Sequence, residues 1–164
     1  LAPSARVLII GPTDEAKGDA IGPDELDAAM RDARIRFLGR RDDVERLYGA
    51  MDCYVLASHR EGFPRSAMEA AAVGLPIVAT DVRGCRQVVD DGATGLLVPR
   101  GDPVALAEAI AHLVADPARR ATMGAAAAAK ARKRFDVETV IRITLETSER
   151  VLAARGVRTP SGAG

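Results

Sequence analysis

Residues 53–80 read CYVLASHREGFPRSAMEAAAVGLPIVAT and contain a strand, a helix and a second strand in succession. The apolar runs 53–56 and 76–80 have the length of buried strands, and the segment 66–73 has helical spacing and stops at Gly74. Short strands that alternate with helices are typical of a parallel sheet. This stretch therefore predicts an α/β fold.

The same alternation continues on both sides of this stretch. We expect further strands at 6–10, 35–38 and 95–98, and helices at 24–32, 42–50, 86–89, 102–114, 116–133 and 137–153. The strands are almost continuously apolar, as expected when helices cover both faces of a sheet. All five strands are therefore predicted to form one parallel, Rossmann-like sheet with right-handed crossovers and helices on both faces.

Composition excludes several classes of protein. The chain has 164 residues, 48% of them hydrophobic and 28% charged, which is ordinary for one globular domain. Lys plus Arg equals Asp plus Glu at 23 each, and a net charge of zero argues against nucleic acid as the main partner. No run of 18 apolar residues predicts a membrane span. Two cysteines, Cys53 expected in the core and Cys85 in a loop, favour a reduced, cytoplasmic setting.

The loop after the strand 53–56 is the best candidate for a ligand site. Ligands of open parallel sheets bind at the carboxyl ends of the strands, and this loop carries Glu61, while Glu69 lies one turn inside the next helix. A carboxylate can accept hydrogen bonds from two neighbouring hydroxyls, such as those of a ribose or a hexose. The alternative is that Glu69 merely interacts with the helix dipole and that the spacing between Glu61 and Glu69 is accidental.

Between the two glutamates lies the start of a helix. The backbone N–H groups of Arg65, Ser66 and Ala67 open this helix and could bind a phosphate. A carboxylate, a helix N-terminus and a second carboxylate would suit a sugar, a phosphate and a ribose in that order.

The stretch around this loop also carries a family resemblance. Its motifs are Phe37-Leu38-Gly39, the run from Leu56 to Phe63, the run from Glu69 to Asp81, then Gly84 and the run from Val88 to Val98. Residues 37–99 thereby resemble the C-terminal domain of retaining glycosyltransferases with the two-domain GT-B fold, of the group 1 or family 4 type. A weaker likeness extends over residues 6–135.

This resemblance implies roles for individual residues. Glu61, the candidate catalytic residue, would contact hydroxyls of the donor sugar, and Glu69 would hold the ribose of the nucleotide. Arg41, through its backbone, and Asp43 would contact the base. The backbone amides around the loop and helix start would face the donor sugar and diphosphate, at positions Gly62, Phe63, Arg65 and Ser66. The family uses no essential metal and no cofactor, since the nucleotide-sugar is a substrate.

Three departures from the family pattern limit what can be carried over. Pro64 stands where the family often has glycine and cannot donate an N–H, and Gln87 stands where many members have glutamate. Lys17-Gly18 looks like the family's basic motif, but about twenty residues separate it from Phe37, too few for the intervening elements. We therefore expect residues 1–156 to form an incomplete C-terminal domain, without its first unit and the N-terminal acceptor domain, and residues 157–164 to form a flexible tail.

The expected function is transfer of a sugar from a nucleotide-sugar, with retention, to an acceptor glycan or lipid-linked sugar. Alternatives are a nucleotide-sugar binding module that is inactive alone, and a sugar-nucleotide epimerase of the same fold; the motif of Glu61 and Glu69 favours the transferase. Basic residues at positions 119–134 could touch the inner face of an anionic membrane, although such a run is usually only a solvated face. The resemblance also implies that the last helix crosses to a partner domain, which would leave Val140, Ile143, Leu145 and Val151 partly exposed.

Overall fold

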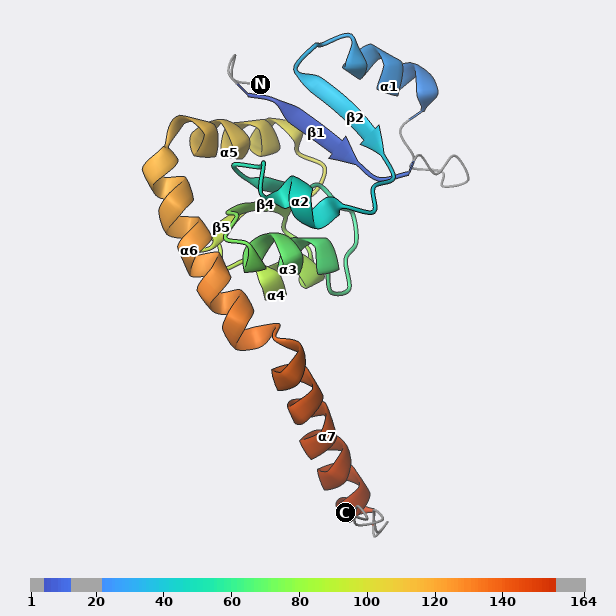
Figure 1. The fold of residues 1–164 in the computed structure, drawn as a ribbon, viewed down its shortest axis with the longest axis vertical. Coiled ribbons are helices and arrows are strands. Elements are labelled where there is room, and N and C mark those ends of the chain that lie inside the picture. The colour runs from blue at the N-terminus through green and yellow to red at the C-terminus, as the bar shows by residue number, and fades with distance from the viewer. Residues whose placement is uncertain (1–4, 13–21, 156–164) are drawn as a thin grey trace.

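The computed structural model describes residues 5–12 and 22–155, in which short strands and helices alternate along the chain (Figure 1). The expectations for Lys17-Gly18 and for a tail at 157–164 lie outside the described residues. In chain order the elements are β1 (Val7–Ile10), α1 (Pro23–Met30), β2 (Ile35–Gly39), α2 (Val44–Tyr48), β3 (Tyr54–Leu56), α3 (Arg65–Ala72), β4 (Ile77–Thr80), α4 (Arg83–Val88), β5 (Gly95–Val98), α5 (Pro103–Ala115), α6 (Pro117–Arg134) and α7 (Val137–Ala154).

All strand pairs in the described part of the chain are parallel, as predicted, but they do not form one sheet. β1 pairs with β2, and a separate sheet has the order β3-β4-β5. The prediction of a single sheet is therefore wrong. An apolar run identifies a strand but not its neighbour, because a ladder also needs an adjacent backbone edge. Within the described residues β1 and β3 are each paired on one side, and Leu8 and Val55 on these strands are exposed.

The central strand β4 organises the core of the larger sheet. All four of its residues are buried, and their side chains alternate between two faces. Ile77 and Ala79 pack with residues of α3, α4 and α6, whereas Val78 packs with residues of α5 and α6. Helices thus cover both faces of this sheet. Cys85 lies in α4 within this core, so the expectation of a loop thiol is wrong, and burial raises its pKa to about 11.

The helices α3 and α6 pack through backbone rather than large side chains. A Cβ built on Gly124 in α6 would overlap the carbonyl oxygen of Gly74, just after α3. The alanine-rich run of α6 is helical as expected, and its small side chains at Ala127 and Ala131 are buried against the core. Both helices therefore approach more closely than larger residues would permit.

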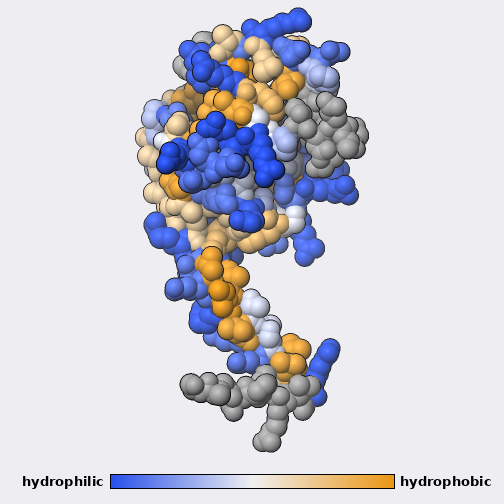
Figure 2. Space-filling model, turned by 45° about the vertical axis from the view of Figure 1, so that its right-hand side comes forward, coloured by the Kyte–Doolittle hydropathy of each residue, from blue (hydrophilic) through white to orange (hydrophobic). Residues whose placement is uncertain are grey.

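The last helix, α7, projects away from the rest of the molecule (Figure 1). Figure 2 shows apolar surface running down this arm, and the exposed apolar residues of α7 include Val140, Ile143, Leu145 and Val151. The expected exposure of these four residues is confirmed. Among the helices in residues 5–12 and 22–155, none has the length and apolar character needed to cross a membrane.

Candidate functional site

The loops after β3 and β4 meet at the carboxyl ends of the larger sheet, where a single threonine joins them. Thr80, at the end of β4, is buried and donates its hydroxyl to the carbonyl oxygen of Ser58. The same hydroxyl oxygen accepts the Ser58 N–H at 3.1 Å. Thr80 thereby fixes the backbone at the point where the chain leaves β3 and enters the loop of Glu61.

Glu61 is held by two neighbours in this region. The Ser58 hydroxyl donates to Oε1 of Glu61 at 2.6 Å, a short, charge-assisted hydrogen bond. Behind the loop lies Gly84 in α4, where a Cβ would stand 2.5 Å from the carbonyl oxygen of Glu61. Only glycine permits this approach, so the turn after β4 supports the backbone of Glu61 directly.

The start of α3 has free donors of the kind that binds anions. Pro64 is its N-cap residue and is buried, and the first helical hydrogen bond runs from the Met68 N–H to the Pro64 carbonyl at 3.1 Å. The N–H groups of Arg65, Ser66 and Ala67 therefore have no partner within the helix. The binding of a phosphate at this helix start remains a prediction.

Glu69 lies on this first part of α3 and touches a buried tyrosine from α2. The Tyr48 hydroxyl donates to Oε2 of Glu69 at 3.1 Å and lies 3.2 Å from the carbonyl oxygen of Ser66. The Arg65 guanidinium is 3.8 Å from the other carboxylate oxygen. Burial and, after it, the charge of Glu69 raise the pKa of Tyr48, so the phenol keeps its proton and remains a donor.

A second tyrosine supports the same helix start. The Tyr54 hydroxyl donates to Oγ of Ser66 at 2.8 Å, and its ring meets that of Tyr48 edge to face at 6.0 Å. Sequence reasoning missed both tyrosines and placed them only as members of a helix and a strand. Their signal was chemical: a buried tyrosine usually needs a partner for its hydroxyl.

Arg41 and Asp43, the predicted base contacts, form a pair of their own before α2. Arg41 donates to both carboxylate oxygens of Asp43 at 2.8 and 2.7 Å, and this contact lowers the pKa of Asp43. Asp43 is the N-cap residue of α2, but its side chain makes no capping hydrogen bond, since both of its carboxylate oxygens accept from Arg41. The side chain of Arg41 is occupied, which is compatible with a base contact through its backbone.

The loop residues Gly62 and Phe63 are exposed on the surface beside Glu61. The ring of Phe63 meets Phe135, at the end of α6, edge to face at 5.6 Å. This contact ties the loop to α6 through the side chain. The predicted amide contacts of both residues to a donor sugar remain a prediction.

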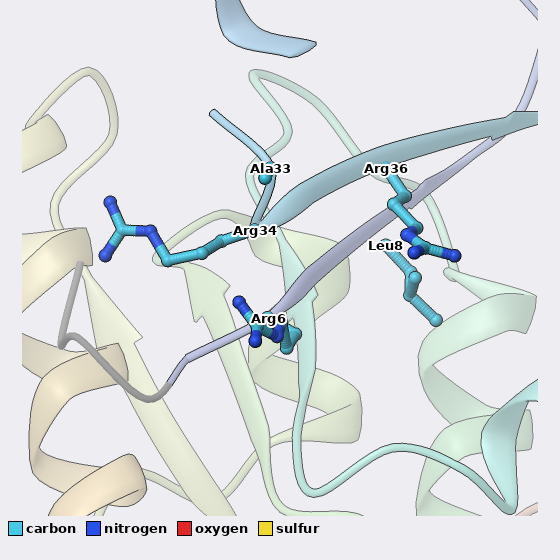
Figure 3. A pocket seen from close by; sticks show the side chains of 5 residues that line it. All are labelled: Arg6, Leu8, Ala33, Arg34 and Arg36. Atoms are coloured by element: carbon cyan, nitrogen blue, oxygen red, sulfur yellow. The ribbon is translucent and has the colours of Figure 1, made fainter. Parts of the chain in front are cut away.

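One cavity lies beside the larger sheet and another lies beside the smaller sheet. One of about 200 Å³ is lined by Ser58, His59, Thr80 and the segment 99–103 after β5, and so adjoins the Glu61 loop. The other, of about 410 Å³, lies on the β1–β2 sheet and contains no predicted site residue; Figure 3 shows its lining side chains, Arg6, Leu8, Ala33, Arg34 and Arg36.

Two further kinds of candidate residue are possible metal ligands and the basic residues at positions 119–134. Among the described residues, no group of three His, Cys, Asp or Glu side chains is placed to hold a metal ion. Two members of the basic run are engaged within the fold: Arg120 donates to the carbonyls of Leu113 and Val114, and Lys130 pairs with Asp90 at 2.8 Å.

Comparison with known proteins decides the family. The model of the glycosyl transferases group 1 matches residues 1–116. The chain belongs to the group 1 glycosyltransferases. This group 1 chain is 37% identical to D-inositol 3-phosphate glycosyltransferase of Kineococcus radiotolerans, over 92% of the chain and 37% of that protein. It is 30% identical to the capsular polysaccharide biosynthesis glycosyltransferase CapM of Staphylococcus aureus, over 74% of the chain and 31% of CapM. The chain thus spans about a third of the length of these relatives.

Solved structures support the same assignment. Anabaena HepE, solved in complex with UDP, superimposes with a TM-score of 0.82 at 30% identity, over 90% of the chain and 42% of HepE. HepE has also been solved with UDP-glucose. The group 1 chain therefore has the α/β fold of GT-B glycosyltransferases, and the family match favours a transferase over the epimerase.

Proposed function

We propose that this chain binds the nucleotide-sugar donor of a retaining glycosyltransferase. The proposal rests on one observation: two carboxylates, each held by a hydrogen bond from a hydroxyl, lie on either side of one helix start. Glu61 receives a hydrogen bond from Ser58 before α3, and Glu69 receives one from Tyr48 inside α3. Between them lie the free N–H groups that open the helix.

Each part of the donor would meet a different part of this arrangement. Glu61 would accept hydrogen bonds from hydroxyls of the donor sugar, with the amides around Gly62 and Phe63 beside it. The diphosphate would lie at the N–H groups of Arg65 and Ser66, where the helix dipole favours negative charge. Glu69 would hold the ribose, and the Arg41–Asp43 loop would lie beside the base.

In this mechanism the protein mainly positions the donor and stabilises the departing group. As the bond from the sugar to the diphosphate breaks, negative charge grows on the diphosphate, and donors at the helix start stabilise it most at that moment. Neither Glu61 nor Glu69 acts as a nucleophile here, because both are assigned to hydroxyl groups. The acceptor would be a glycan or a lipid-linked sugar, bound by a second, acceptor-binding domain.

We further propose a cytoplasmic location with peripheral contact to the inner face of the membrane. The basic side chains that remain exposed on α6 are Arg119, Arg132, Lys133 and Arg134. Such residues are attracted to anionic lipid. Co-sedimentation with vesicles containing an anionic lipid, compared with neutral vesicles, tests this contact.

Calorimetric titration with UDP, GDP and ADP tests donor binding. We expect one of these nucleotides to bind and Glu69→Gln to weaken it about ten- to a hundredfold, because a charged acceptor for two hydroxyls is lost. Glu61→Gln should leave the affinity for the nucleotide unchanged and lower that for the nucleotide-sugar. Glu108→Gln, at an exposed position of α5, is the matched control. Equal nucleotide affinity of wild type and Glu69→Gln, with the fold intact, would refute the proposal.

A further inference from the structure

We propose that Tyr48 is a positioning residue that orients the Glu69 carboxylate to receive both hydroxyls of the nucleotide ribose. This inference rests on the proposed function, because it needs Glu69 to be the ribose contact. It assigns to a residue on α2 a task in nucleotide recognition that it performs through Glu69.

Tyr48 is suited to this task because it is buried and packed on several sides. Its residue is only 3% exposed, and its ring packs with Ala70 and Leu75 and against the edge of the Tyr54 ring. Its hydroxyl stands near two groups of α3, Oε2 of Glu69 at 3.1 Å and the carbonyl oxygen of Ser66 at 3.2 Å. The phenol hydroxyl is therefore a donor whose position relative to helix α3 is fixed.

Glu69, by contrast, needs a restraint. Its side chain is 50% exposed, and a free glutamate loses rotamer freedom when it is ordered. Arg65 cannot supply the restraint, because its side chain is 86% exposed and its guanidinium lies 3.8 Å from Oε1. A hydrogen bond from a buried phenol orders the carboxylate before the ligand arrives, which lowers the entropy cost of binding.

The geometry also leaves the carboxylate able to bind. Tyr48 uses one acceptor position on Oε2, while a carboxylate offers about four. Oε1 and the second acceptor position of Oε2 remain for two vicinal hydroxyls. Because the Tyr48 hydroxyl fixes Oε2, it also fixes the plane in which these two hydroxyls must lie.

A test of this inference must separate a positioning role of Tyr48 from a general role in stability. The preference for a nucleotide with ribose hydroxyls over one without them makes this separation. Calorimetry measures the affinity for whichever of UDP, GDP and ADP binds and the affinity for its 2′,3′-dideoxy analogue. The ratio of these two affinities is compared among wild type, Tyr48→Phe, Glu69→Gln and Tyr54→Phe. We expect Tyr48→Phe to lower the ratio about fivefold or more, with affinity for the dideoxy nucleotide unchanged. Tyr54→Phe, which removes a hydroxyl that contacts Ser66 instead, is the matched control and should keep the ratio.

The outcomes distinguish failure of this inference from failure of the proposed function. If wild type does not favour the nucleotide that it binds over the dideoxy analogue of that nucleotide, or if Glu69→Gln keeps the preference, the proposed function and this inference both fail. If Glu69→Gln loses the preference and Tyr48→Phe keeps it, only the inference fails. An equal loss of affinity for both nucleotides in Tyr48→Phe also overturns the inference, since it indicates loosened structure. In the double variant Tyr48→Phe/Glu69→Gln the ratio should fall no further than in Glu69→Gln alone.

Discussion

The hydroxyl of Thr80 satisfies both backbone groups of Ser58, which lies 22 residues earlier in the chain. Thr80 is buried, so water cannot readily replace these bonds. Thr80→Val keeps the shape of the side chain and removes the hydroxyl. We expect it to lower the free energy of unfolding by about 1–3 kcal/mol, as measured by urea denaturation. Thr80→Ser, which keeps the hydroxyl, should lose clearly less, and equal losses in both variants would contradict this account.

Residues of the site differ in how far sequence could predict them. Glu61, Ser66 and Glu69 lie close together in the chain, so the spacing of the loop and helix was enough to bring them into one hypothesis. Their supports come from elsewhere: Tyr48 stands 21 residues before Glu69, and Gly84 stands 23 after Glu61. Such contacts depend on how α2 and α4 pack, which no local pattern records.

At the scale of elements, the close approach of α3 and α6 predicts that α6 does not tolerate a side chain at Gly124. A methyl group at Gly124 would collide with the backbone at Gly74, where no flexible side chain can yield. Gly124→Ala should therefore destabilise the fold by about 2 kcal/mol or more, despite the better helix propensity of alanine. Thermal and urea unfolding measure the loss.

A control on the same helix separates the collision from helix propensity. Ala125→Val adds two carbon atoms at an exposed position of α6 and should cost no more than about 0.7 kcal/mol. If Gly124→Ala is as stable as wild type, the two helices do not pack through their backbones.

The order and type of the elements followed from sequence because apolar runs and helix-start signals are local. Asp102 and Asp116, for example, cap α5 and α6 with their side chains, as an Asp-Pro pair predicts. The pairing of the strands could not be predicted from sequence in the same way. Which edge of β1 or β3 meets another strand depends on segments distant in the chain, so one expected sheet became two.

At the scale of the whole molecule, α7 forms an arm about 27 Å long beyond the packed core. Among the side chains of α7 that the structure describes, none belongs to a core cluster. We therefore expect a chain ending at Asp136 to unfold within about 2 °C of the full chain in calorimetry. A core variant, Leu113→Ala, should instead cost about 2–5 kcal/mol. A fall of more than about 5 °C on truncation would show that α7 stabilises the body.

The two tyrosines of the site also determine the optical properties of the protein. The chain has no tryptophan and two tyrosines, and both hydroxyls contact residues of α3 that are proposed to bind the nucleotide. The tyrosine fluorescence of the chain and the tyrosine bands of its near-ultraviolet circular dichroism therefore originate from two side chains that contact the start of α3. If a ribose engages this carboxylate as proposed, we expect it to change the surroundings of the Tyr48 hydroxyl, so that occupancy of the site would be visible in the protein's own spectrum, without a label.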